Sequence, residues 1–329
     1  MKALVFEAPE RAAVLDRDEP AIGPDEVLIA SRAVGICHSD FELLDGHYII
    51  PVSYPVVPGH EWAGDVVEVG SAVEGLEPGD AVVGECVVGP EGRDHFGFSI
   101  DGADAEYFKA RGEWLHKLPH GMSHTVGALV EPFSVAYNAV LAAGGMDPSD
   151  AVAVMGGGPI GLLTVIAAAA NNARVVLVEP QAHRRELAQR LGAHTALDPT
   201  AHDYGDAVAD VTAGRGFDVV IEAAGAPAAM AGALEIAGHG ARLVYVGIDV
   251  GSRAPAQLGL IQSKALQIRG IIGSPGIWPK TIRFLASGVV DPAPIVTATF
   301  PLAEALDALA AARDTASNVK VHIRTGADV

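Results

Sequence analysis

The feature that most constrains this chain is an apolar run that ends in closely spaced glycines and is followed at once by a helical segment. Residues 151–170, AVAVMGGGPIGLLTVIAAAA, place Gly156, Gly158 and Gly161 in the spacing G-x-G-x-x-G. In such a turn the first glycine allows the tight bend, the second lets the backbone approach a pyrophosphate, and the third packs helix on strand. The segment predicts a dinucleotide-binding unit whose helix N-terminus faces the anion.

A carboxylate stands where such a unit binds the ribose. The next apolar run, RVVLVEP, ends in Glu179, which lies 21 residues past Gly158 (179 − 158 = 21), and a carboxylate there accepts hydrogen bonds from ribose hydroxyls. Its charge repels a 2′-phosphate, so we predict NAD over NADP, a preference that the nearby Arg184 and Arg185 would soften. We expect the cofactor to contact Gly156, Gly158, Pro159, Ile160, Gly161, Glu179 and Arg184.

The texture of the sequence changes near residue 150. Before it, short β-branched runs between Gly and Pro turns predict a barrel-like β domain. After it, apolar runs such as FDVVIEAAG and ARLVYVGI are mostly separated by helical segments, which predicts a parallel sheet covered on both faces. The tail is predicted to form a helix and then a closing strand, VKVHIR.

Composition excludes several classes of partner. The net charge of −19 argues against nucleic acid or an anionic membrane surface, because both require a basic patch. No apolar run reaches the roughly 18 residues of a membrane span, and the N-terminal residues lack a secretory pattern. Two cysteines cannot build a disulfide framework. We therefore expect a soluble, cytoplasmic protein.

Zinc-binding side chains recur in the first part of the chain. Cys37 lies in GICHSD, His60 and Glu61 in PGHEWAG, and Glu131 in EPFSVAYNAV. Zinc takes thiolate, imidazole and carboxylate ligands, and a catalytic site uses three of them with one position left open. Each residue alone would be unremarkable, but together they predict a metal site.

These motifs, in this order and at about these distances, carry a resemblance to a known family. From residue 1 to about 325 the chain resembles the zinc-dependent medium-chain alcohol dehydrogenases, in particular the branch of sorbitol, threonine and butanediol dehydrogenases. The resemblance implies a Rossmann doubly wound parallel sheet and an irregular GroES-like β-barrel, an α/β protein. The expected limits are 1–125 with 290–329 for the zinc-binding catalytic domain and 126–289 for the NAD-binding domain.

The same resemblance implies the ligand set. Cys37 and His60 become zinc ligands, and the carboxylate ligand is Glu61 or Glu131, since members of that branch use one or the other. Simple alcohol dehydrogenases place a second cysteine at the position of Glu131. Its absence here favours polyol-like or other secondary-alcohol substrates.

Three neighbours of Cys37 are expected to serve catalysis. Asp40 falls where the family's carboxylate fixes the tautomer of the histidine ligand, and Ser39 falls at the hydroxyl that passes on the substrate proton. Many relatives complete this relay with a histidine where this chain has Glu42. The final acceptor is therefore left open among Glu42, His38, His47 and water, and His38 is alternatively placed against the cofactor's pyrophosphate.

The predicted activity is hydride transfer between a secondary alcohol (a polyol, diol or sugar-like substrate) and NAD, which gives a ketone. A zinc-free quinone or enoyl reductase generally lacks the Cys, GHE and EP motifs, and a non-catalytic NAD-binding protein has no need of Ser39. These two remain the alternatives. The family also implies a homodimer or homotetramer, often joined along edge strands, for which LQIRGIIGS is a candidate.

One zinc per chain is expected. Many relatives hold a second, structural zinc with four cysteines in a lobe that corresponds here to CVVGPEGRDHFGFSIDGADAEY, where only Cys86 appears. A lone thiol cannot close a tetrahedral site, so we predict that packing stabilises this lobe.

Overall fold

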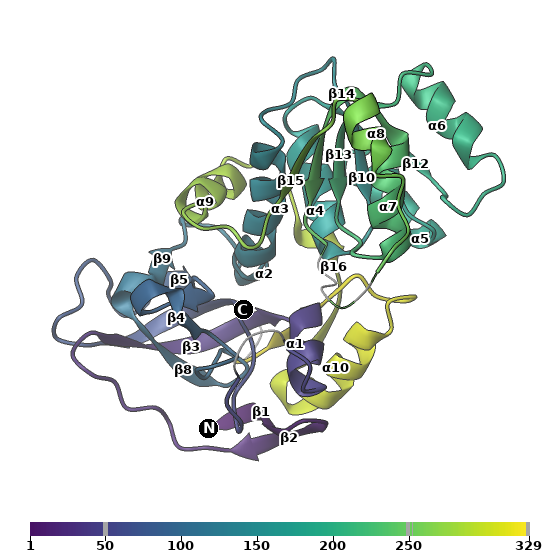
Figure 1. Cartoon of the computed structure of the whole chain (residues 1–329). Coiled ribbons are helices and arrows are strands. Elements are labelled where there is room, and N and C mark those ends of the chain that lie inside the picture. Colours follow the sequence, from purple (N-terminus) through teal and green to yellow (C-terminus); the bar gives the residue numbers. More distant parts are fainter. Residues whose placement is uncertain (49–51, 248–250, 252, 327–329) are drawn as a thin grey trace. The chain divides into compact units, whose positions relative to one another are not determined.

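A computed structural model describes residues 1–48, 52–247, 251 and 253–326. By contacts the chain divides into two units: Met1–Glu131 with Trp278–Ala286 and Val296–Val329, and Pro132–Ile277 with Ser287–Ile295. We call these the first and the second unit. The colours of Figure 1 follow the sequence from the N-terminus to the C-terminus.

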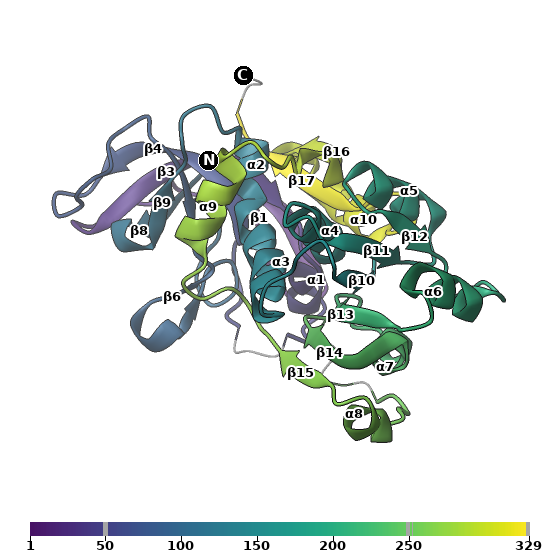
Figure 2. The same ribbon diagram turned by 90° about the horizontal axis from the view of Figure 1, so that it is seen from above.

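The second unit contains a parallel sheet with the strand order β12-β11-β10-β13-β14-β15. Figure 2 shows β12 and β15 toward its opposite ends. Its strands are β10 (Ala151–Met155), β11 (Arg174–Val178), β12 (Thr195–Leu197), β13 (Phe217–Glu222), β14 (Ala237–Tyr245) and β15 (Gln267–Gly270). The order reverses beside β10, which is the switch point of a doubly wound fold, so the predicted Rossmann sheet is confirmed.

Helices connect these strands. Because parallel crossovers are right-handed, the helices that follow β10 and β11 lie on one face and those that follow β12 and β13 on the other. The central strands are accordingly apolar: β10 is buried along its whole length, and β11 is exposed only at Arg174. The helices are α3 (Val130–Ala142), α4 (Pro159–Ala169), α5 (Ala182–Arg190), α6 (Tyr204–Thr212), α7 (Pro227–Ile236) and α8 (Gly259–Ser263), with the short 3₁₀ turn η3 (Ala293–Ile295).

The first unit is built on a seven-stranded mixed sheet. Its order is β16-β17-β3-β4-β5-β9, and β8 pairs with β3. The two small sheets β1-β2 and β6-β7 complete the strands of this unit. The strands are β1 (Lys2–Ala8), β2 (Arg11–Asp16), β3 (Glu26–Gly35), β4 (Glu61–Val69), β5 (Ala81–Gly84), β6 (Val87–Val88), β7 (Asp94–His95), β8 (Tyr107–Arg111), β9 (Leu115–Lys117), β16 (Val296–Pro301) and β17 (Lys320–Arg324).

Few helices accompany this sheet, as expected for a GroES-like domain. They are α1 (His38–Leu44), α2 (His124–Ala128), α9 (Trp278–Ala286) and α10 (Ala305–Arg313), with the 3₁₀ turns η1 (Pro90–Gly92), η2 (Gly112–Trp114) and η4 (Leu302–Glu304). Helix α10 lies beside α1 (Figure 1), where the Arg313 guanidinium sits over the Phe41 ring. The predicted closing helix and strand are α10 and β17, and β17 reaches the middle of the sheet by pairing with β3.

The limits of the units differ from the domain limits that we predicted. The predicted limit between residues 125 and 126 falls within helix α2, which packs against β3 and β4 of the first unit, so this unit extends to Glu131. Trp278–Ala286 also belongs to the first unit, where the Trp278 ring stacks on His116. None of the described helices is long and apolar enough to cross a membrane.

Candidate active site

Two antiparallel strands bring the predicted metal ligands together. Strand β3 ends at Gly35, and Cys37 follows as the N-cap of α1. His60 directly precedes β4, and Glu61 is the first residue of that strand. Because Gly35 pairs with Glu61 in the β3-β4 register, the thiol at the end of one strand meets the imidazole and carboxylate at the start of the next.

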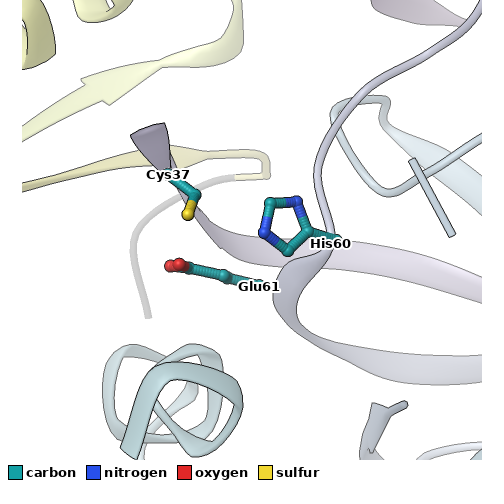
Figure 3. Close-up of side chains that lie close together, drawn as sticks. All are labelled: Cys37, His60 and Glu61. Carbon is teal, nitrogen blue, oxygen red and sulfur yellow. The ribbon is translucent and has the colours of Figure 1, made fainter. Parts of the chain in front are cut away.

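Cys37, His60 and Glu61 have the geometry of a metal centre. Their donor atoms all lie within 4.8 Å of one another, and Figure 3 shows the three side chains pointing toward one another. His60 is 4% and Glu61 1% exposed, while Cys37 is partly exposed. Bond lengths near 2.0–2.3 Å place tetrahedral zinc ligands roughly 3.5 Å apart, so a small contraction would close this set around an ion. Within the described residues it is the only such group.

Asp40 lies beside the imidazole of His60, and its role in fixing the tautomer stays a prediction. Its Oδ1 lies 3.4 Å from His60 Nδ1, and its Oδ2 accepts the backbone N–H of Cys37 at 2.8 Å. Burial would lower the pKa of His60, but the adjacent Asp40 carboxylate raises it well above its usual value. The carboxylate thus favours a proton on Nδ1, which leaves Nε2 to face the cluster.

The other predicted catalytic residues lie along α1. Ser39 Oγ is 3.5 Å from His60 Nε2, the ring atom that faces the cluster. Glu42 is partly buried one turn further along the helix, and His38 and His47 are exposed. The structure therefore brings Ser39 to the candidate metal site, while the order of acceptors beyond it stays a prediction.

Glu131 lies close to the cluster without belonging to it. It stands in the first turn of α3, and its carboxylate is not among the donors that meet within 4.8 Å. Burial and the charge of Glu61 raise the pKa of Glu131 to about 7. Of the two carboxylates that the sequence offered, this arrangement places Glu61 with Cys37 and His60.

Sequence reasoning missed Lys320. This residue begins β17, is 2% exposed, and forms an ion pair with Glu61 Oε2. Its Nζ also donates to the carbonyl oxygen of Ile36 at 3.0 Å. Burial would lower the pKa of Lys320, but Glu61 and Cys37 raise it. A lysine inside the short strand VKVHIR was the available signal, because buried lysines are rare unless they are paired.

The glycine-rich turn has the shape predicted from its spacing. Gly156 follows β10 with φ +98°, a conformation that favours glycine. Gly158 caps α4, and a Cβ there would meet open space, as the approach of a ligand requires. A Cβ on Gly161 would collide with the carbonyl oxygen of Gly156, so helix and strand pack closely. Helix α4 begins with Pro159 and Ile160. The free backbone N–H groups in the first turn of a helix suit a phosphate.

Glu179 and Arg184 lie beside this turn. Glu179 is 4% exposed, and its two oxygens accept the N–H groups of Gly157 at 2.6 Å and Gln181 at 2.8 Å. Arg184, which we expected to contact the cofactor, is 8% exposed. The guanidinium group of Arg185 donates hydrogen bonds to the carbonyl oxygens of Glu179 and Pro180. The acidic residue therefore also fixes the loop, a role that its sequence position did not reveal.

The shortened lobe contains no second group of metal ligands among its described residues. It forms the two-stranded sheet β6-β7 and the turn η1. Cys86 packs against an apolar cluster that includes Phe98, and burial raises the pKa of its thiol to about 12. Such a thiol is a poor metal ligand, because metals bind the thiolate.

Comparison with known proteins gives the same picture for both units. Residues 23–120 match the family described as alcohol dehydrogenase GroES-like domain, and residues 159–287 match the family described as zinc-binding dehydrogenase. Sorbitol dehydrogenase of Bacillus subtilis (strain 168) is 34% identical over an alignment that covers 94% of this chain and 92% of that protein.

Two solved structures resemble the chain over nearly its whole length. The 2R,3R-butanediol dehydrogenase from Bacillus subtilis has a TM-score of 0.90 and 32% identity, with 99% of each chain covered. A protein of Sinorhizobium meliloti 1021 that was solved bound to NADP has a TM-score of 0.90 and 30% identity, with 98% of this chain and 99% of that one covered.

Proposed function

The chain belongs to the zinc-dependent medium-chain alcohol dehydrogenases, and from this premise we propose that it oxidises a secondary alcohol of the polyol, diol or sugar type to a ketone. It is an oxidoreductase that uses zinc and NAD(P). The observation that carries the proposal is the group of Cys37, His60 and Glu61, which brings a thiol, an imidazole and a carboxylate within 4.8 Å of one another.

This site also separates the proposal from its rivals. A zinc-free reductase has no use for a thiol, an imidazole and a carboxylate that converge within 4.8 Å. A non-catalytic NAD-binding protein has no use for a hydroxyl next to the metal-facing atom of His60, which Ser39 provides. Both observations favour a zinc-dependent enzyme.

The residues divide the work of the reaction. Cys37 and His60, with Glu61 or Glu131, would hold the zinc. When bound, zinc supplies a Lewis acid that lowers the pKa of an alcohol hydroxyl, and NAD supplies a hydride acceptor. Asp40 holds the tautomer of His60. Ser39 is placed to accept the substrate proton and to pass it on.

The substrate class follows from the carboxylate at position 131. Glu131 stands where simple alcohol dehydrogenases have a cysteine, and related proteins of the same length range act on sorbitol and 2R,3R-butanediol by name. Both are compounds with secondary hydroxyl groups. We therefore place the substrate among polyols, diols and sugar-like alcohols.

NAD is proposed as the preferred cofactor. Glu179 lies beside the glycine-rich turn, where a carboxylate would repel a 2′-phosphate. The remaining lone pairs of its carboxylate are available to ribose hydroxyls. Arg184, buried next to it, is the residue that would admit NADP as the weaker alternative.

We further propose one zinc per chain and a homodimer or homotetramer. The oligomer is supported by β15, which lies at the end of the six-stranded sheet with all four residues exposed. Ile268 on this strand is 41% and Ile272 beyond it 71% exposed. An exposed edge strand that carries apolar side chains such as Ile268 is a surface that proteins normally cover.

A panel of secondary alcohols tests the proposed function. Sorbitol, 2,3-butanediol, threonine and inositols are incubated with the zinc-loaded protein and NAD, and reduced cofactor is followed by absorbance. We expect turnover of at least one polyol or diol that disappears after zinc is removed by a chelator and returns when zinc is restored. Turnover that survives complete removal of the metal would refute the zinc-dependent mechanism.

A further inference from the structure

Lys320 and Glu61 form the most deeply buried lysine–carboxylate pair in the described part of the chain. Both side chains are 2% exposed. The ammonium group is held from two directions, because it also donates to the carbonyl oxygen of Ile36, the residue before Cys37. Glu61 is at the same time one of the three donors of the candidate metal site. One carboxylate therefore faces a fixed cation and a metal position.

Gly35 leaves the space in which this pair forms. It lies on β3, next to Glu61 of β4 and His322 of β17 in the two registers. A Cβ on Gly35 would overlap Glu61 Oε2 and would lie 2.9 Å from Lys320 Cε. Its backbone is not left-handed, since Gly35 has no positive φ, so an alanine there would displace the side chains of the ion pair without straining the backbone.

The charges of the site balance in two groups. A zinc ion is neutralised by the Cys37 thiolate and one carboxylate, and the structure offers two carboxylates, Glu61 and Glu131. Lys320 neutralises the other carboxylate, and in this structure its partner is Glu61. Without the lysine, the buried carboxylate of Glu61 would lose this cation, and a buried charge that loses its partner is costly.

We propose that Lys320 is a positioning residue that competes with zinc for Glu61 and thereby keeps one ligand position of the metal exchangeable. This inference rests on the proposed zinc site. The ammonium draws electron density and a lone pair of Glu61 away from the ion, so Glu61 binds weakly and can yield to Glu131 or to the substrate oxygen. In this proposal Lys320 acts through Glu61.

The test compares the zinc-loaded wild type with Lys320→Met and with Lys320→Arg, which keeps the charge. Zinc release to a chromogenic chelator is timed, and the absorption spectrum of the cobalt(II)-substituted protein is recorded. Removal of the competing cation should slow metal release about five-fold or more, a factor typical of coupling between contacting groups. It should also weaken the cobalt bands as a further oxygen joins the ion, and Lys320→Arg should restore both readouts.

Two controls assign the effect. In a Glu61→Gln background, Lys320→Met should change neither the release rate nor the spectrum, since the competition is already gone. Gly35→Ala keeps both charged groups but forces them apart, so it should act in the same direction as Lys320→Met, and it carries the test if that variant does not fold.

The outcomes separate this inference from the proposed function. Wild-type protein that binds no zinc through Cys37 and His60 would remove the proposed site itself. One zinc per chain in all variants, with equal release rates and unchanged cobalt spectra, would leave the proposed function standing and would overturn the role of Lys320.

Discussion

Acid sensitivity centred on His322 is a prediction that can be worked out from the structure. His322 lies in β17, is fully buried, and neither of its ring nitrogens has a hydrogen-bond partner within the described residues. Burial, together with the charges of Lys320 and Arg324, lowers the pKa of His322 to about 3. The unfolded chain binds the same proton near pH 6.5.

The sign and size of the effect follow from these two values. Between pH 6.5 and 3 the unfolded state binds more protons than the folded state, so stability falls as the pH falls. The loss is about 1.4 kcal/mol for each pH unit below 6.5, or roughly 2 to 3 kcal/mol at pH 4.5. That is a large share of the 5–15 kcal/mol that a typical protein has.

Fluorescence can follow the relevant unit alone. The three tryptophans of the chain, Trp62, Trp114 and Trp278, all lie in the first unit together with His322. Urea unfolding of the wild type and of His322→Val is measured at several values from pH 7.5 to 4.5. The variant lacks the titrating group, so its free energy of unfolding should fall less steeply by about 1 kcal/mol per pH unit.

A difference in the free energy of unfolding that is the same at every pH does not test this reasoning, because valine also removes two unbonded nitrogens at every pH. The test is the slope of the free energy of unfolding against pH. Parallel pH dependences of the wild type and His322→Val would show that His322 is not forced to stay neutral in the fold.

Three further predictions concern the site. Cys37→Ala or His60→Ala should remove both bound zinc and turnover, because each takes one of only three protein ligands; metal analysis that finds full zinc in either variant would mean that the site is elsewhere. Cys86→Ser should leave activity and one zinc per chain intact, since its thiol is buried against apolar side chains, and two tightly bound zincs in the wild type would contradict the interpretation of the lobe. NAD should give a higher kcat/KM than NADP, and Glu179→Ala should narrow this gap while raising the KM for both, because the Gly157 N–H loses its acceptor; an NADP value at or above that for NAD in the wild type would refute the preference.

Local spacing allowed much of the architecture to be predicted. The spacing of Gly156, Gly158 and Gly161 is typical of a strand, a glycine-rich turn and a helix in succession. The structure has these elements at this place. The ligand types Cys37 and His60 were equally visible, because thiolate and imidazole chemistry is carried by the residues themselves. Alternating apolar runs and helices then predicted the parallel sheet, as periodicity reflects which face each element buries.

Choices between residues with the same chemistry required the tertiary structure. The sequence offered Glu61 and Glu131 as equivalent carboxylates, and the β3-β4 register placed only Glu61 within the group that meets at 4.8 Å. Arg184 was predicted to contact the cofactor, and only the structure showed that its side chain is buried. Neither outcome follows from spacing along the chain, because burial depends on which surfaces pack together.

Lys320 shows the limit most clearly. It is far from Glu61 in the sequence, and it reaches the site only because β17 inserts beside β3 and Gly35 leaves room for the two side chains. The sequence determined which groups can bind a metal and a nucleotide, since those are properties of single residues and short motifs. The tertiary structure decided which charges face one another, since the energy of a buried charge depends on neighbours that strand pairing brings from distant parts of the chain.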